Sequence, residues 1–152
     1  MNPEPPKIVY EDDPGTPGWK RWSLPDPTLF NAFLGPILVK VEDGIARVRM
    51  QPAPRHANLR GHVHGGALSG FIDVALFAAS RGFGVLQFGT AATLDLSIQF
   101  IAGASIERPV EARVELLRET GRLLFLRGLI VQDDATVASF SGTVRKPSPA
   151  AA

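Results

Sequence analysis

The sequence predicts an α+β fold in which an antiparallel sheet wraps around one long central helix. Residues 65–80 are apolar on nearly every face when they are placed at helical spacing. A helix of this kind loses its apolar surface to water only if other elements enclose it. The segments before and after it alternate polar and apolar residues or are rich in β-branched residues, which is typical of strands. With 152 residues, the chain is expected to form one domain.

The two ends of the chain are expected to lie outside this domain. Seven of the 13 prolines fall within residues 1–27, which predicts a proline-rich arm with little regular structure. A short helix is expected at residues 26–33, with Asp26 as its N-cap. The domain proper is expected to span residues 28–146, and residues 147–152 are expected to form a disordered tail.

Six strands are expected around the helix, and turn residues separate them. The first two are joined through Asp43 and Gly44, a strong hairpin signal. The third alternates strictly, so its polar side chains, Thr93 among them, are expected on the face opposite its apolar side chains. The last three form a meander with turns at residues 120–121 and 133–134. The predicted strands are residues 37–41, 45–50, 93–100, 110–116, 123–131 and 137–144.

Composition excludes several classes of function. The formal net charge is +1 and the chain has no block of Lys or Arg, so neither nucleic acid nor an anionic membrane is an expected partner. The chain has no cysteine, which excludes a disulfide framework, a thiolate zinc site and a cysteine nucleophile. Neither a signal peptide nor an apolar run of about 20 residues is visible, so a cytoplasmic location is expected.

Gly65 and Gly66 stand where the central helix is expected to begin. The first amide groups of a helix have no partner within it, and the helix dipole is positive there. Because glycine has no Cβ, a carbonyl oxygen can come close to these amides and be polarised, as in an oxyanion hole. A tight strand-to-helix turn explains the two glycines equally well.

Asp73 is the only ionisable residue of the predicted helix up to Ser80. Burying an unpaired carboxylate costs several kcal/mol, so a partner or a function must account for it. At helical pitch Asp73 shares a face with the small residues Gly66, Ser69 and Gly70, which leave room for a ligand or a partner helix. A hydrogen-bonded carboxylate at an interface is the alternative interpretation.

The spacing of these two features has a geometric consequence. Gly65 and Asp73 are eight residues apart, which separates their backbones by about 12 Å along a helix. A carboxylate that far away cannot reach a carbonyl carbon held at the start of its own helix. If both groups act on one substrate, we expect them to come from two chains.

Polar residues just before the helix are further candidates for the site. Asn58, His62 and His64 are placed to hold a water, a substrate carbonyl or the acid, although a histidine in a turn is often only a hydrogen-bonding group. Together with His56, the histidines also suggest a zinc site, but their spacing matches no established ligand motif, and no metal is expected.

These residues resemble those of the hotdog-fold acyl-CoA thioesterases of the phenylacetate-degradation type, within the 4-hydroxybenzoyl-CoA thioesterase superfamily. The resemblance rests on Asn58 followed after five residues by His64-Gly65-Gly66, on Asp73, and on the strand that begins at Thr93. It covers about residues 28–145.

The resemblance implies a five- or six-stranded antiparallel sheet around the helix, a dimer formed by edge-to-edge extension of the sheets, and often a tetramer. It implies hydrolysis of an acyl-CoA without any cofactor. Asp73 would attack the thioester or activate water, and the Gly65 amide of the facing subunit would polarise the carbonyl. Asn58 and His64 would orient the substrate and the acid.

Other roles that the resemblance implies concern substrate binding. Gly66 would contribute to substrate binding at the helix start, and Thr93 occupies the place of a hydroxyl residue that positions the hydrolytic water. The nucleotide of CoA would rest on surface basic groups, for which the candidates are Arg60, Arg81, Arg122 and Arg145.

Two other functions remain open at this point. One is a hotdog domain that binds acyl-CoA without hydrolysing it, although no fused DNA-binding segment is visible. The other is a hotdog hydratase or dehydratase, which would add water to, or remove it from, a carbon-carbon bond of an acyl-CoA.

Overall fold

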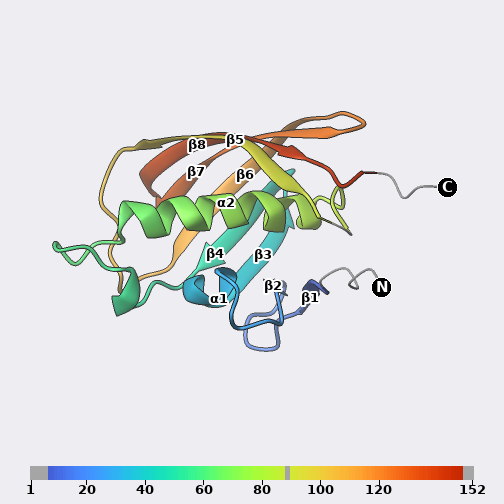
Figure 1. Ribbon diagram of the computed structural model, residues 1–152. Helices are drawn as coiled ribbons and strands as arrows, with labels where there is room; N and C mark the ends of the chain where they lie inside the picture. The colour runs from blue at the N-terminus through green and yellow to red at the C-terminus, as the bar shows by residue number, and fades with distance from the viewer. Residues whose placement is uncertain (1–6, 88–89, 149–152) are drawn as a thin grey trace.

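The structure, a computed structural model, describes residues 7–87 and 90–148. Residues 1–6 of the predicted arm and residues 149–152 of the predicted tail lie outside the described part. Within it, eight strands form one antiparallel sheet in the order β1-β2-β3-β4-β6-β7-β8-β5 (Figure 1). The strands are β1 (Val9–Asp12), β2 (Lys20–Ser23), β3 (Ile37–Glu42), β4 (Ile45–Met50), β5 (Ala92–Phe100), β6 (Val110–Glu119), β7 (Leu123–Gln132) and β8 (Ala135–Arg145).

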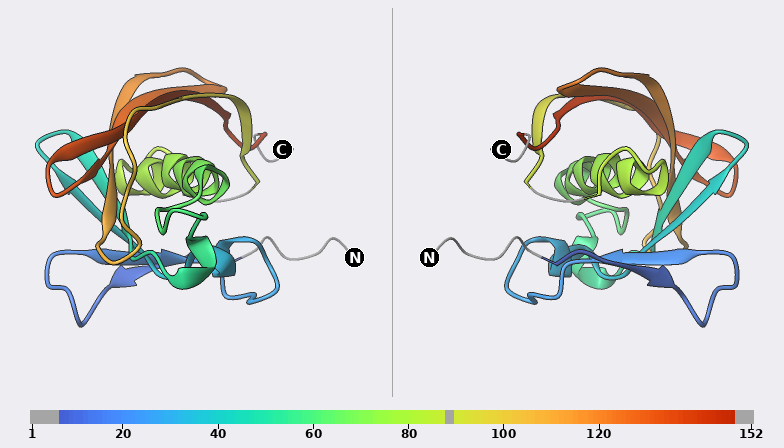
Figure 2. Two further views of the ribbon diagram at one scale, coloured as in Figure 1. Left: turned by 90° about the vertical axis from the view of Figure 1, so that its left-hand side faces the viewer. Right: turned by 90° about the vertical axis from the view of Figure 1, so that its right-hand side faces the viewer.

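The predicted α+β architecture is confirmed, because the sheet curves around helix α2 (Gly65–Gly82). Seen nearly end-on, α2 lies inside the curve of the sheet, with the N-terminal segment on its remaining side (Figure 2). Phe71, Ile72, Ala75 and Leu76 are completely buried against the strands. Each large apolar side chain buried in this way contributes about 1.5–3 kcal/mol, so the helix is held by the enclosure that its composition requires.

The six predicted strands are all present, and their turns have the expected backbone. Asp43 and Gly44 both have positive φ, 53° and 76°, which suits the tight turn between β3 and β4. Asp133 and Asp134 also have positive φ, 49° and 64°, between β7 and β8. Right-handed strand twist favours turns of this kind, so these residues set the register of both hairpins.

The prediction that residues 1–27 have little regular structure is wrong for two segments. β1 pairs with β2, and β2 pairs with β3, so the arm extends the sheet by two strands beyond the implied five or six. Trp22 is 4% exposed and pairs with Ile37 on the helix-facing side of the sheet. Burial of a large aromatic side chain stabilises these strands, although the proline content of the segment argued against regular structure.

A second tryptophan fixes the arm from the other side of the sheet. Trp19 is 6% exposed. The guanidinium carbons of Arg49 and Arg47 on β4 lie 4.2 and 5.2 Å from its ring centroid. Such cation–π contacts add about 0.5–2 kcal/mol each. The arm is therefore anchored on both faces of the sheet.

The helix predicted at residues 26–33 is shorter and begins later than expected. Helix α1 comprises only Asn31–Leu34, and its N-cap is Phe30. Asp26 instead accepts hydrogen bonds from the backbone N–H and the hydroxyl of Thr28, at 2.9 and 2.6 Å. These bonds lower the pKa of Asp26. They hold Asp26 in a local turn, which competes with the start of a helix.

Strand β5 departs from strict alternation at one residue. Thr93 pairs with Val144, whereas Asp95 pairs with Thr143, so Leu94 is an extra residue in a bulge. Val144 is completely buried, and its partner Thr93 therefore points toward α2. The expectation that Thr93 shares a face with Asp95 is wrong, because the bulge reverses the side-chain direction at this point.

Membrane crossing by a helix is not supported by the fold. Among residues 7–87 and 90–148, no helix has both the length and the hydropathy that a membrane crossing needs.

Candidate active site

Asp73 lies near the middle of α2 and is bonded to Thr93 of β5. The Thr93 hydroxyl donates to Asp73 Oδ1 at 2.6 Å, in a partly buried position. Oδ2 has no hydrogen-bond partner within the part of the chain that the structure describes. One oxygen is therefore held in place, and the other remains available to a substrate or to water.

A pocket of about 230 Å³ opens beside Asp73. It lies between α2, the N-terminal arm and the segment that follows α2. Its lining residues are Ile8, Trp22, Leu24, Asn31, Asp73, Val74, Phe77, Arg81, Leu86, Gln87, Thr90 and Ala91. The candidate carboxylate thus faces a space that is mostly apolar, which suits the hydrocarbon part of a ligand.

The N-terminal end of α2 holds the second group of candidates. His64 is the N-cap, and its Nδ1 accepts a 2.8 Å hydrogen bond from the Gly66 N–H. In this bond neutral His64 carries its proton on Nε2. The Gly65 N–H has no acceptor among the described residues. Of the two glycine amides, the one at Gly65 is therefore free to polarise a carbonyl, and the one at Gly66 is occupied.

Asn58 organises the loop that leads to this helix end. Its Oδ1 accepts from the backbone N–H groups of Arg60 and His62, at 2.8 and 3.1 Å. Its own N–H donates to the His62 carbonyl at 2.7 Å. Asn58 thus closes residues 58–62 into a compact turn, and its side-chain amide nitrogen has no acceptor among the described residues.

The small residues beside Asp73 are covered by the chain itself. A Cβ at Gly66 would lie 3.0 Å from His64 Nδ1, and a Cβ at Gly70 would lie 2.7 Å from Phe30 Cζ. The side chains of His64 and Phe30 therefore occupy the space that the missing Cβ atoms of Gly66 and Gly70 leave. The expected opening to a ligand lies instead on the side of Asp73 that faces the arm.

The other two histidines serve the fold. His56 is 1% exposed, accepts from the Ala53 N–H at Nδ1 and lies 2.6 Å from the Phe33 carbonyl at Nε2. His62 packs where a Gly103 side chain would otherwise lie. Across residues 7–87 and 90–148, His, Cys, Asp and Glu side chains form no group of three that could hold a metal ion.

The candidates therefore fall into two groups within one chain. Asp73 and Thr93 lie together, and Asn58, His64, Gly65 and Gly66 lie together at the start of α2. The helix between them is unbroken from Gly65 to Gly82, so the eight-residue spacing corresponds to about 12 Å. One chain does not bring the Gly65 amide and the Asp73 carboxylate to the same atom.

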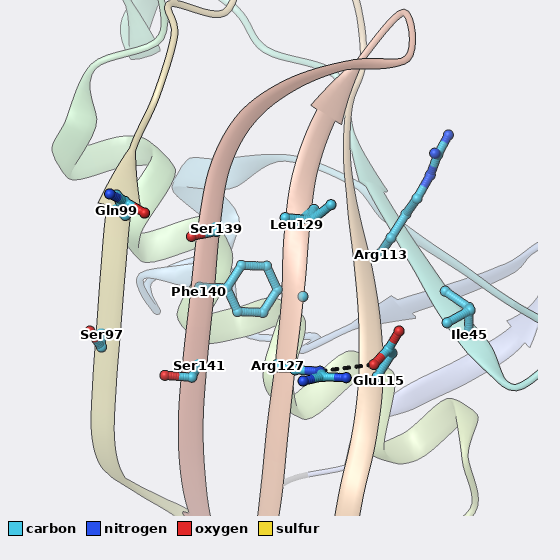
Figure 3. Close-up of a pocket in the computed structure, with 11 residues that line it drawn as sticks. Ile45, Ser97, Gln99, Arg113, Glu115, Arg127, Leu129, Ser139, Phe140 and Ser141 are labelled. Carbon is cyan, nitrogen blue, oxygen red and sulfur yellow. Dashed lines mark hydrogen bonds and ion pairs between the residues drawn. The ribbon is translucent and has the colours of Figure 1, made fainter.

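A larger hollow, of about 690 Å³, lies elsewhere on the molecule. It runs across strands β4 to β8 on the face of the sheet that points away from α2 (Figure 3). Polar side chains such as Ser97, Ser139 and Ser141 line it, and an ion pair of Arg127 with Glu115 crosses it. None of the candidate residues lines it, so its size alone does not make it the site.

Sequence reasoning gives covering a pocket as one of two alternatives for the tryptophans of the arm, the other being packing against a neighbouring subunit. Ile8, Trp22 and Leu24 of the arm and Asn31 of α1 lie far from Asp73 in the sequence, and no local pattern connects them. The one available signal was the presence of two tryptophans among the prolines, since tryptophan rarely stays exposed without a partner. Arg81 did carry a signal, because it lies eight residues after Asp73 on the same helix face.

Comparison with known proteins shows the family to which the chain belongs. The model of the thioesterase superfamily matches residues 60–139. The TT0310 protein from Thermus thermophilus is 30% identical, with 81% of this chain and 99% of that chain covered and a TM-score of 0.65. A mutant of the phenylacetic acid degradation protein PaaI from the same organism is 30% identical, with 80% and 99% covered and a TM-score of 0.64.

A third solved structure is similar in fold alone. It is a hypothetical thioesterase protein with coenzyme A from Streptococcus pneumoniae, 20% identical, with 72% of this chain and 90% of that chain covered and a TM-score of 0.61. Among curated proteins, none matches the chain significantly.

An antiparallel sheet around one helix, similar to these structures over most of their length, is the hotdog fold. The chain belongs to the thioesterase superfamily, because the model of that family matches more than half of it. The family resemblance expected from the sequence is thereby confirmed. Thioester hydrolysis is the class of activity that this membership supports.

Proposed function

We propose that the protein hydrolyses an acyl-CoA thioester to the free acid and CoA, without a cofactor, at a site shared between two subunits. The observation that carries this proposal is the pair Asp73 and Thr93, which presents an unoccupied carboxylate oxygen to a largely apolar pocket. The family supplies the class of reaction. CoA as the carrier is supported by the related fold whose structure was solved with coenzyme A.

Asp73 can act in two ways, and both balance chemically. As a nucleophile, its carboxylate oxygen bonds to the thioester carbon, the C–S bond breaks, the CoA thiolate takes up a proton, and water then cleaves the mixed anhydride. As a general base, Asp73 takes a proton from water, whose oxygen bonds to the carbon before the C–S bond breaks. Thr93 fixes the carboxylate in the first route and is also placed to hold the water in the second.

The developing oxyanion needs donors, and the start of α2 offers one. The Gly65 N–H, which has no acceptor in the described part of the chain, stands at the positive end of the helix dipole. Because α2 is rigid, this amide would come from the partner subunit. His64 and Gly66 would hold that helix end in shape, and the free amide group of Asn58 would orient the substrate.

The free edge of the sheet supports a dimer. β5 ends the strand order, so one of its edges is unpaired within the described chain. Leu94 and Phe100 on this strand are 52% and 55% exposed, and Ile101 just after it is 54% exposed. Exposed apolar edge strands pair readily with other strands, so a second copy is the natural occupant, and a tetramer of two dimers is expected.

The test is release of free thiol from a panel of acyl-CoAs, with Asp73→Asn as the variant. We expect turnover by the wild-type protein and a loss of about 100-fold or more in kcat for the variant, since proton transfer or nucleophilic attack is removed. The matched control is Asp95→Asn, at an exposed aspartate on the outer face of β5, the strand that also carries Thr93, and it should leave kcat unchanged. Equal turnover of wild type and Asp73→Asn would remove Asp73 from the mechanism.

The same panel separates the competing functions. Binding of acyl-CoA without thiol release by the wild-type protein would favour a non-catalytic binding domain. Hydration of an enoyl-CoA without thiol release would favour a hydratase. Single turnover in ¹⁸O-labelled water tests the direct route, because label appears in the Asp73 carboxylate when water opens the mixed anhydride at the aspartyl carbon, whereas base catalysis places the label only in the product acid.

A further inference from the structure

The pocket beside Asp73 contains a charged group at its other end. Asp73, Phe77 and Arg81 are spaced by four residues each on α2, and all three line the pocket. Residues at this spacing form one stripe along a helix. A carboxylate and a guanidinium therefore stand at the two ends of the stripe, with an aromatic ring between them.

Arg81 is held in place without being neutralised. Its guanidinium carbon lies 4.7 Å from the ring centroid of Tyr10, a residue of strand β1. Burial raises the pKa of Tyr10, an effect that the charges of Lys20 and Arg81 oppose, so the ring is neutral at ordinary pH. Among the described residues, no acidic side chain forms an ion pair with Arg81. A preorganised, partly buried guanidinium of this kind favours an anion as its partner.

The rest of the lining is mostly apolar. Ile8, Trp22 and Leu24 of the N-terminal arm line the pocket together with Phe77 and Leu86, and its uncharged polar residues are Asn31, Gln87 and Thr90. Asp73 is the one carboxylate among the described lining residues, so no other acid there competes for Arg81. A ligand that is mostly apolar along its length and anionic at the end that reaches Arg81 matches this lining.

The volume of the pocket gives a scale for that ligand. Its 230 Å³ would hold roughly eight water molecules at ~30 Å³ each, hence an acyl group of about eight non-hydrogen atoms. Along α2, Asp73 and Arg81 are separated by about 12 Å, part of which the two side chains occupy. A short chain with polar groups at both ends matches this space.

We propose that the protein selects short acyl groups that carry a carboxylate at their far end, and that Arg81 recognises this carboxylate. This inference rests on the proposed function, since it places the thioester at Asp73. The acyl chain would lie along Phe77 and beneath the arm, with its terminal carboxylate on the Arg81 fork. The arm, which lies outside the residues that the family model matches, would then form one wall of the specificity pocket.

Arg81 is also one of the arginines proposed above for the nucleotide of CoA, and the structure favours the acyl role. It shares a small pocket with Asp73, whereas the pantetheine arm separates the thioester of an acyl-CoA from its phosphates. The two roles predict different selectivity, so they can be distinguished by experiment.

The experiment compares two isosteric substrates, glutaryl-CoA and 5-methylhexanoyl-CoA, which differ in a terminal carboxylate against an isopropyl group. We expect wild-type kcat/KM to favour glutaryl-CoA by about ten-fold or more, since hydrogen bonds to charged groups are strong. Arg81→Gln should abolish the preference by lowering the value for glutaryl-CoA alone, and Arg81→Lys should restore part of it. Arg118→Gln, at an exposed arginine of β6 outside the pocket, is the control and should change neither value.

An equal loss with both substrates in Arg81→Gln would assign Arg81 to the CoA part and overturn the inference, as would a wild-type preference for the apolar isostere. Calorimetric binding to Asp73→Asn separates this failure from that of the proposed function. Tighter binding of glutaryl-CoA than of its isostere, lost in Asp73→Asn/Arg81→Gln, upholds the recognition by Arg81 even if the wild-type protein hydrolyses neither. Equal binding of the two would overturn it.

Discussion

Thr93 and Asp73 meet because β5 contains one extra residue. Leu94 forms a bulge, so that Thr93 faces α2 and donates a 2.6 Å hydrogen bond to Asp73. Without the bulge, Thr93 would lie on the outer face together with Asp95. Bulges of this kind often redirect a side chain beside a functional site.

The Thr93 hydroxyl should therefore matter for turnover more than for folding. Thr93→Val keeps the shape of the side chain but removes the donor to Asp73, and we expect kcat to fall about ten-fold or more. Thr93→Ser keeps the donor and should retain most of the activity. Steady-state kinetics on a hydrolysed acyl-CoA measures both, and equal rates for the valine and serine variants would contradict a role for the hydroxyl.

Gly65→Ala should separate activity from stability. A Cβ there would lie 3.7 Å from the Phe100 ring, an ordinary contact, so the fold accommodates it. Alanine is also the better helix former, and the free energy of unfolding should stay equal or rise by up to about 1 kcal/mol. If a substrate carbonyl approaches the Gly65 amide, the added methyl group obstructs it, and kcat/KM should drop by about ten-fold. Denaturation and kinetics on the same preparation test this, and unchanged kinetics would place the oxyanion elsewhere.

Much of this fold can be predicted from sequence, for local reasons. The enclosed helix follows from its uniform apolarity, and the hairpins follow from Asp43-Gly44 and Asp133-Asp134. Asp73 and Gly65 can be identified as candidate site residues because a carboxylate is unusual within an apolar helix and a glycine at the helix start leaves an amide accessible. The bulge at Leu94 cannot be predicted, because the residues of β5 alternate in type whether or not the strand is bulged. Only the pairing register with β8 reveals the extra residue.

The arm escaped sequence prediction for a different reason. Its strands add to a sheet built from residues beyond position 36, and Trp19 and Trp22 dock on the two faces of that sheet. Prolines in the intervening loops dominate the local pattern, whereas the stabilising contacts are long-range. The pocket that the arm forms with α2 could not be predicted before those contacts were known.

Trp22→Ala should destabilise the protein by about 3–5 kcal/mol, as removal of a buried aromatic side chain does. Trp22→Phe should cost much less, because the Trp22 Nε1 makes no hydrogen bond within residues 7–87 and 90–148 that phenylalanine would lose. Asp12→Ala is a matched control on the same hairpin, since its ion pair with Lys20 is exposed and contributes little. Urea denaturation measures all three, and a cost of Trp22→Ala no larger than that of Asp12→Ala would show that the arm is not anchored to the domain.

A substitution at Gly128 tests how closely β7 packs against the backbone of β6 and the Phe140 side chain. A Cβ at this position of β7 would clash with the Arg113 carbonyl oxygen and would lie 2.6 Å from Phe140 Cζ. The backbone of a paired strand cannot move aside as the end of a flexible side chain can. Gly128→Ala should therefore lower the free energy of unfolding by about 1–3 kcal/mol. Gly121→Ala should change it by less than about 0.5 kcal/mol, because the added Cβ would have no atom of the described residues within 4 Å. Thermal or urea denaturation distinguishes the two, and equal stability of both variants would contradict this packing.

The central claim is that the acid and the amide that act on one carbonyl belong to different subunits, and complementation tests it most directly. Asp73→Asn and Gly65→Ala proteins, each impaired alone, are mixed, unfolded and refolded together. Each mixed dimer would contain one site with both wild-type groups, so activity should recover to about one quarter of the wild-type value, since half of randomly formed dimers are mixed. If the mixture is no more active than the average of the two variants, the two groups act within a single chain or not on the same atom, and the shared site is disproved.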